Sequence, residues 1–175
     1  MRPIAQLATA SLLAAASLAA LAHGSQPGGA HRLDPLGAPL DFTLPSLDGK
    51  RFVKASAFSG PVLVNFWGKD CAPCIEELPR LEAFAKANPH WTVLLVSIDT
   101  PAQAHEFVQR HGLQLTVLRR GANVEALMRT GGNPHGALPF TVALREGRIC
   151  DLQLGDMGAN DLQRVNAACS AAGKP

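Results

Sequence analysis

A cysteine pair stands at the junction of two differently patterned segments of this chain. Residues 61 to 67, PVLVNFW, form a nearly continuous apolar run with β-branched residues, which predicts a strand buried on both faces. From 72 to 87, apolar residues recur at three-residue steps, as in an amphipathic helix that Pro79 is expected to kink. Cys71 and Cys74 therefore lie where a strand ends and a helix begins. Such a pair serves as a structural staple, as half of a metal site or as a reversible redox switch.

The rest of the chain alternates between strand-like and helix-like patterns. In FTLPSLDGKRFV, Asp48 and Gly49 separate two short extended runs, which predicts a hairpin with a two-residue turn. The later patterns predict, in chain order, a strand at 91–99, a helix at 101–112, a strand at 115–119, a short helix at 122–132, a hairpin at 140–155 and a helix at 160–172. This order implies an α/β fold. We expect a central mixed β-sheet with parallel central strands, flanked by helices on both faces, and an N-terminal β-hairpin extension.

Composition limits the classes of function. Hydrophobic residues make up 47% of the chain and charged residues 17%, which fits one globular domain. The formal charge of +2 is spread along the chain, and no stripe of Lys and Arg predicts a nucleic-acid surface. Small molecules or other proteins are the expected partners.

The N-terminus has the pattern of an export signal. Arg2 precedes a nearly apolar stretch that ends in a small-x-small site, so we expect a signal peptide over 1–22. The alternative is an uncleaved anchor, since the apolar stretch is about as long as a short membrane span. A flexible linker over 23–39 and one domain over 40–175 follow. The protein is therefore expected to be periplasmic or otherwise exported, and in contact with a membrane only if the N-terminal segment is kept.

The position of the cysteine pair favours redox chemistry. The unpaired N–H groups and the positive dipole end of the helix stabilise a thiolate at Cys71, which makes Cys71 the expected nucleophile. Cys74 lies one turn further into the helix and is expected to be less exposed. It would act as the resolving thiol, which attacks the mixed disulfide and releases the reduced partner.

Three segments resemble a known family. VLVNFWGKDCAPCIEELP is similar to the active-site segment of the thioredoxin superfamily, and within it to the exported TlpA/ResA-like thiol-disulfide oxidoreductases, which include cytochrome-c maturation reductants. The upstream FTLPSLDGKRFVKASAFSGPVLVNFW and the later HGALPFTVALREGRI also resemble this branch. The resemblance implies a thioredoxin-like fold, protein disulfides as substrates and a membrane thiol-disulfide electron donor. It implies a role in cytochrome c maturation or oxidase assembly, without a cofactor.

The same resemblance implies a substrate-binding surface. By this likeness Pro139 is a cis-proline that faces the cysteine pair, and the alternative is an ordinary trans loop proline. A cis bond there would leave the backbone of Leu138 free to pair with an extended substrate segment. The other expected substrate-binding residues are Trp67, Ala72 and Pro73, with Trp67 either a platform at the rim or core packing.

Two residues depart from the thioredoxin pattern. Asn65 stands where classical thioredoxins carry a buried aspartate, and the TlpA/ResA-like branch instead carries a glutamate that matches Glu77. Glu77 would then take the proton of Cys74 during exchange, or else lie solvated near the helix start. Asp70 stands beside Cys71 at a position where the families that this segment resembles usually carry an aromatic residue. Its carboxylate would raise the pKa of the Cys71 thiol, whereas the neighbouring Lys69 would lower it.

Two further cysteines lie outside the motif. Cys150 falls in the last predicted strand and Cys169 near the end of the last helix. A bridge between them would close a loop of about 20 residues and stabilise the domain by ~3 kcal/mol. Two buried free thiols and a second redox pair are the alternatives.

Two other functions fit parts of the chain. A peroxiredoxin-like peroxidase has a similar upstream segment, but its Pro-x-x-x-Thr-x-x-Cys pattern does not precede Cys71. A copper-handling protein of thioredoxin-like fold would use Cys71, Cys74 and His135, because thiolates and imidazole suit Cu(I). The expected site for the redox function contains no metal.

Overall fold

The computed structural model describes residues 35–171, so the expected signal peptide and the linker up to residue 34 lie outside the described residues. The elements are, in chain order, β1 (Thr43–Pro45), β2 (Phe52–Lys54), the short 3-10 helix η1 (Ala55–Ala57), β3 (Val62–Trp67), α1 (Ala72–Ala87), β4 (Thr92–Ser97), α2 (Pro101–His111), β5 (Thr116–Leu118), α3 (Val124–Thr130), β6 (Phe140–Arg145), β7 (Arg148–Leu154) and α4 (Ala159–Ala171). The predicted order of strands and helices is confirmed.

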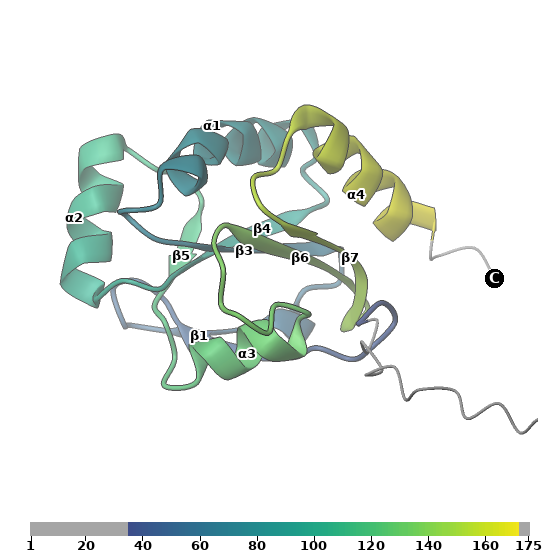
Figure 1. The fold of residues 1–175 in the computed structure, drawn as a ribbon, viewed down its shortest axis with the longest axis horizontal. Coiled ribbons are helices and arrows are strands. Elements are labelled where there is room, and N and C mark those ends of the chain that lie inside the picture. The colour runs from purple at the N-terminus through teal and green to yellow at the C-terminus, as the bar shows by residue number, and fades with distance from the viewer. Residues whose placement is uncertain (1–34, 172–175) are drawn as a thin grey trace, which may run out of the picture. The chain divides into compact units, whose positions relative to one another are not determined.

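The central sheet is mixed, with its strands in the order β5-β4-β3-β6-β7. Strand β3 pairs in parallel with β4 and antiparallel with β6, and β4 pairs in parallel with β5. Figure 1 shows α1 and α4 over one face of this sheet and α3 over the other. The predicted α/β architecture is therefore confirmed.

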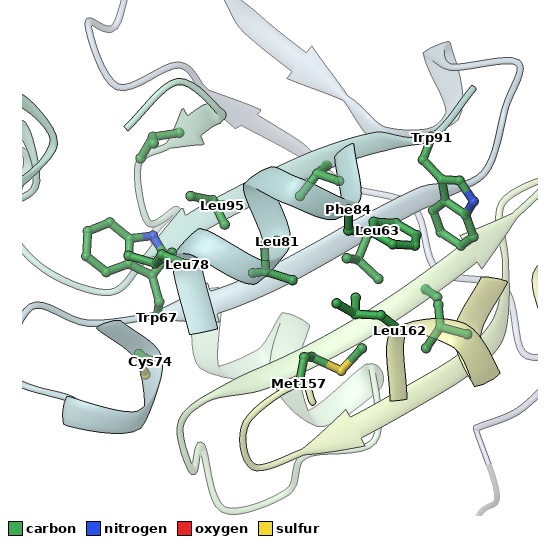
Figure 2. Packing of buried hydrophobic residues seen from close by; sticks show 14 of the residues in the cluster. Leu63, Trp67, Cys74, Leu78, Leu81, Phe84, Trp91, Leu95, Met157 and Leu162 are labelled. Atoms are coloured by element: carbon green, nitrogen blue, oxygen red, sulfur yellow. The ribbon is translucent and has the colours of Figure 1, made fainter. Parts of the chain in front are cut away.

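Strand β3 sends alternate side chains into two separate apolar layers. Leu63 and Trp67 belong to the layer beneath α1, α2 and α4, whereas Val64 and Phe66 belong to the layer beneath α3. Figure 2 shows side chains of the first layer packed between α1 and the sheet, with Cys74 at one end of the group. Because successive side chains of a strand point to opposite faces, Asn65 lies on the α1 side.

Helix α1 begins directly at the cysteine pair. Cys71 is its N-cap residue, Pro73 stands in its first turn, and Pro79 lies inside the helix without ending it. Proline suits the first turn because its missing N–H has no intrahelical partner there. One face of the helix buries Leu78 and Leu81 against the sheet. The apolar periodicity thus fixes the helix rotation that directs Cys74 toward the core.

Two expectations near the N-terminus differ from the structure. The hairpin formed by β1 and β2 has a six-residue connection, 46–51, instead of a two-residue turn, because the Ser46 hydroxyl accepts from the Arg51 N–H and the Ser46 carbonyl accepts from the Gly49 N–H. Residues 37–40, mostly within the expected linker, hydrogen-bond to the β6–β7 hairpin through Gly37 and Leu40. These residues are thus part of the ordered domain.

Candidate active site

The cysteine pair forms a disulfide at the start of α1. The Sγ atoms of Cys71 and Cys74 are 2.06 Å apart. The side chain of Cys71 is partly exposed, whereas Cys74 is fully buried. An incoming thiolate therefore reaches the sulfur of Cys71, while Cys74 is protected by the core.

The loop before β6 lies beside this pair. The Leu138–Pro139 peptide bond is cis, and β6 then pairs Phe140 with Phe66. A Cβ atom built on Gly68, which follows β3, would lie 3.6 Å from Cδ1 of Leu138. Within residues 35–171, neither backbone group of Leu138 is hydrogen-bonded. An extended segment of a partner protein can therefore pair with Leu138.

The other residues expected to bind substrate divide into two groups. Ala72 and Pro73 are exposed beside Cys71, where a partner disulfide would approach. Trp67 is fully buried and packs against Phe107, with a ring centroid distance of 4.9 Å. The expectation that Trp67 contacts substrate is therefore wrong, because the ring is fully buried in the apolar layer beneath α1 and α2.

A buried polar cluster lies beneath α1. The Glu77 carboxylate is fully buried, and its Oε1 accepts a hydrogen bond of 2.6 Å from Nδ2 of Asn65. The same Nδ2 donates to Oγ1 of Thr141 at 2.9 Å, and Oε2 of Glu77 accepts from the backbone N–H of Met157 at 2.7 Å. Glu77 is therefore directed inward, and a solvated carboxylate at the helix start is not what the structure shows.

Burial raises the pKa of the Glu77 carboxyl above its ordinary value, and the hydrogen bonds from Met157 and Asn65 only partly oppose this. Nearby charges act in both directions, since Asp156 raises this pKa and Arg80 lowers it. A carboxyl with a raised pKa holds a proton closer to neutral pH. Such a group is suited to exchange a proton with a thiol on the same helix.

Sequence reasoning missed three contributors to this cluster. Thr141 was detectable in principle, because it shares a sheet face with Ala143 and pairs directly with Asn65. No pattern in the sequence indicates that the Met157 N–H and the Arg80 side chain belong to this cluster. Arg80 Nε donates to the Met157 carbonyl at 2.9 Å, across 77 residues of sequence. Glu77 and Arg80 thus hold the same loop residue from one helix.

Asp70, the residue before Cys71, forms an exposed ion pair with its neighbour Lys69. Its Oδ2 lies 2.5 Å from Nζ of Lys69, and the Asp70 side chain is 85% exposed. The backbone N–H of Lys69 also donates to Asp99 at 2.8 Å, which fixes the segment before Cys71. The two opposite charges largely cancel at this exposed position.

Replacing Asp70 by Asn tests how much this carboxylate matters. We expect the rate of Cys71 alkylation at neutral pH to change by less than about threefold, since exposed and paired charges interact weakly. The measurement is the pH dependence of iodoacetamide labelling of the reduced protein. An increase above tenfold would show that Asp70 controls the Cys71 thiolate.

The second cysteine pair is also bridged. The Sγ atoms of Cys150 in β7 and Cys169 in α4 are 1.98 Å apart, and Cys169 is fully buried. This bond joins the last helix, α4, to β7, the edge strand of the sheet. Figure 1 shows where these two elements lie. Arg164 and Asp151 form an ion pair between the same two elements.

Removing this second bridge is expected to affect stability and spare catalysis. The double variant Cys150→Ala/Cys169→Ala should unfold with a free energy lower by about 3 kcal/mol, because its unfolded chain is no longer closed into a loop. Urea denaturation of the oxidised proteins measures this change. A large loss of disulfide reductase activity in the folded variant would instead assign the second pair a redox role.

Within the described residues, no group of three or more His, Cys, Asp and Glu side chains is placed to hold a metal ion. His135 is exposed in the loop before Pro139 and does not complete such a group with the cysteine pair. No helix in the described part is long and apolar enough to cross a bilayer.

Comparison with known proteins decides the family. The AhpC/TSA family matches residues 37–125, a range that contains β1 to β5 and the whole of α1. The chain belongs to this family. Thioredoxin of Chlamydia trachomatis is 38% identical over 71 residues, which cover 40% of this chain and 70% of that protein.

Two further relatives extend the similarity beyond the motif. The thiol-disulfide oxidoreductase ResA of Halalkalibacterium halodurans is 28% identical over 123 residues, which cover 67% of each chain. The thioredoxin domain of a thiol-disulfide oxidoreductase from Bacteroides vulgatus has a TM-score of 0.65 at 20% identity and covers 77% of this chain and 97% of its own. The fold is thus thioredoxin-like, and the AhpC/TSA member described here is a thiol-disulfide oxidoreductase.

Proposed function

We propose that this protein is an exported reductant of protein disulfides that works through a reversible Cys71–Cys74 disulfide. The observation that carries the proposal is the unequal exposure of the two cysteines, beside a Leu138 backbone that is unpaired within residues 35–171. A partner segment paired with Leu138 would bring its own disulfide to Cys71. The buried Cys74 would then be shielded from other thiols and disulfides, and would react with the mixed disulfide formed at Cys71.

The reaction needs no cofactor. In the reduced protein, the Cys71 thiolate attacks one sulfur of the substrate disulfide, and the other substrate sulfur leaves as a thiolate that takes a proton. Cys74 loses its proton and attacks Sγ of Cys71 in this mixed disulfide, so the second substrate sulfur leaves. Two electrons have passed to the substrate, and Cys71 and Cys74 are left as the disulfide. We assign Glu77 as the acceptor of the Cys74 proton.

We further propose that a membrane thiol-disulfide donor restores the reduced state outside the cytoplasm. The apolar segment over 1–22 supports export, and the likeness to ResA-type proteins supports substrates in cytochrome c maturation or oxidase assembly. A reductant in an oxidising compartment needs a dedicated donor to reduce its disulfide again after each turnover, because dissolved thiols are scarce there.

Insulin reduction tests the proposed activity. The reduced domain, recycled by dithiothreitol, is expected to speed precipitation of the insulin B chain in a manner that depends on Cys71. A parallel assay with hydrogen peroxide addresses the peroxidase alternative. Rapid consumption of peroxide without insulin reduction would overturn the proposal.

A further inference from the structure

Asn133 is a fully buried polar residue in the loop that leads to Pro139. Its Nδ2 donates to the carbonyl of Ala137 at 2.7 Å, and its Oδ1 accepts from the N–H of Ala137 at 3.1 Å. Both polar atoms of one amide side chain are thus bonded to the backbone of a single residue. The Asn133 N–H donates in turn to the carbonyl of Met128 in α3 at 2.9 Å. The loop is therefore fastened to the buried end of α3.

This arrangement sets the direction of one particular backbone group. The carbonyl of Ala137 and the N–H of Leu138 belong to the same peptide unit, and only the next bond, Leu138–Pro139, is cis. In a trans peptide the C=O and N–H point in opposite directions. Since the Ala137 carbonyl points toward buried Asn133, the Leu138 N–H points away from Asn133, and it has no partner within residues 35–171.

The loop between Asn133 and Pro139 is held by hydrogen bonds at both of its ends. The following residues, Pro134 to Ala137, are exposed. Asn133 is therefore the residue that holds this part of the loop to the interior of the domain. At the other end, Gly155 N–H donates to the carbonyl of Pro139 at 2.9 Å. Leu138 lies between Ala137, which Asn133 holds, and Pro139, which Gly155 holds, and within residues 35–171 both of its own backbone groups are unpaired.

We propose that Asn133 is a positioning residue that orients the Leu138 backbone for pairing with an extended protein segment. It thereby sets the preference of the enzyme for protein disulfides over small disulfides. This inference rests on the proposed disulfide reductase function. A small aromatic disulfide needs only the Cys71 sulfur, whereas a protein disulfide also needs the backbone of its flanking residues to be bound.

The test compares two substrates in three variants. Asn133→Ala removes both hydrogen bonds to Ala137, and Asn133→Asp keeps the volume but places an oxygen against the Ala137 carbonyl. Asn88→Ala is the matched control, because Asn88 Nδ2 donates to the carbonyl of Phe84 at the far end of α1. The substrates are insulin and 5,5′-dithiobis(2-nitrobenzoate). The reduction potential of each variant is measured as well.

We expect kcat/KM for insulin to fall about tenfold in both Asn133 variants, mainly through KM, since one or two backbone hydrogen bonds to the substrate are misaligned. The rate with the small disulfide should change by less than twofold. The reduction potential should stay the same within the error of its measurement. Asn88→Ala should leave both substrates unaffected.

Two results would overturn the inference. Equal losses with both substrates would mean that Asn133 supports the fold or the thiols in general, and unchanged insulin kinetics would mean that the Leu138 backbone is oriented without it. A wild-type protein inactive toward both disulfides would instead refute the proposed function itself, and the inference with it.

Discussion

Cys71→Ser is expected to reduce insulin reductase activity to the uncatalysed background, a loss of at least about 1000-fold. A serine hydroxyl is not ionised at neutral pH, and Cys74 cannot substitute because its side chain is fully buried. The variant should remain folded, because Cys71 is a partly exposed N-cap residue and the second bridge is intact. Insulin turbidity and thermal unfolding measure the two properties separately.

The matched control for this prediction is Cys74→Ser. It keeps the nucleophile but removes the resolving thiol, so it should form a mixed disulfide with the substrate that non-reducing electrophoresis detects. If Cys71→Ser retains activity or Cys74→Ser forms no such adduct, the order of attack assigned to the two sulfur atoms is wrong.

Glu77→Gln is expected to slow resolution of the mixed disulfide about 100-fold, the usual contribution of a positioned general base. Gln fits the same volume and can still accept the hydrogen bond from Met157, but it cannot take a proton from Cys74. Stopped-flow measurement should show fast formation of the mixed disulfide and slow release of the reduced partner. Equal slowing of both steps would argue that Glu77 only maintains the packing beneath α1.

The same variant should change how stability depends on pH. Because burial raises the Glu77 pKa in the folded state, the native protein keeps a proton that the unfolded chain loses above pH ~4.5. Stability therefore falls as pH rises through this range, and each pKa unit corresponds to about 1.4 kcal/mol. Glu77→Gln should gain stability relative to the wild type between pH 4.5 and 8. Urea unfolding at several pH values checks this, and a constant difference would contradict it.

Local patterns sufficed for the helices and strands of this chain. The apolar run before Cys71 became β3, and the three-residue periodicity over 72–87 matches the bounds of α1. Each of these elements buries a row of side chains, so the spacing of apolar residues along the local sequence is enough to predict it. The connection between β1 and β2 was predicted wrongly, because the side-chain hydroxyl of Ser46 takes the hydrogen bond from the Arg51 N–H.

The site was harder to predict than the fold because it depends on contacts between distant segments. The cysteine motif indicated its chemistry, and the likeness of the Leu-Pro segment indicated the cis bond that the structure contains. The burial of Trp67 could not be read from its neighbours, since Phe107 covers it from another helix. The inward direction of Glu77 likewise follows from Asn65 lying on the α1 side of β3.

The most direct test of the account is a redox titration of the purified domain in glutathione and dithiothreitol buffers, with the thiols alkylated and mapped at each potential. We predict one reversible two-electron step at Cys71 and Cys74, near the thioredoxin value of about −270 mV, with Cys150 and Cys169 still bridged. A potential near −120 mV would indicate an oxidant. If the Cys71–Cys74 disulfide could not be reduced and re-formed reversibly, the claim that this pair is the redox-active site would be contradicted.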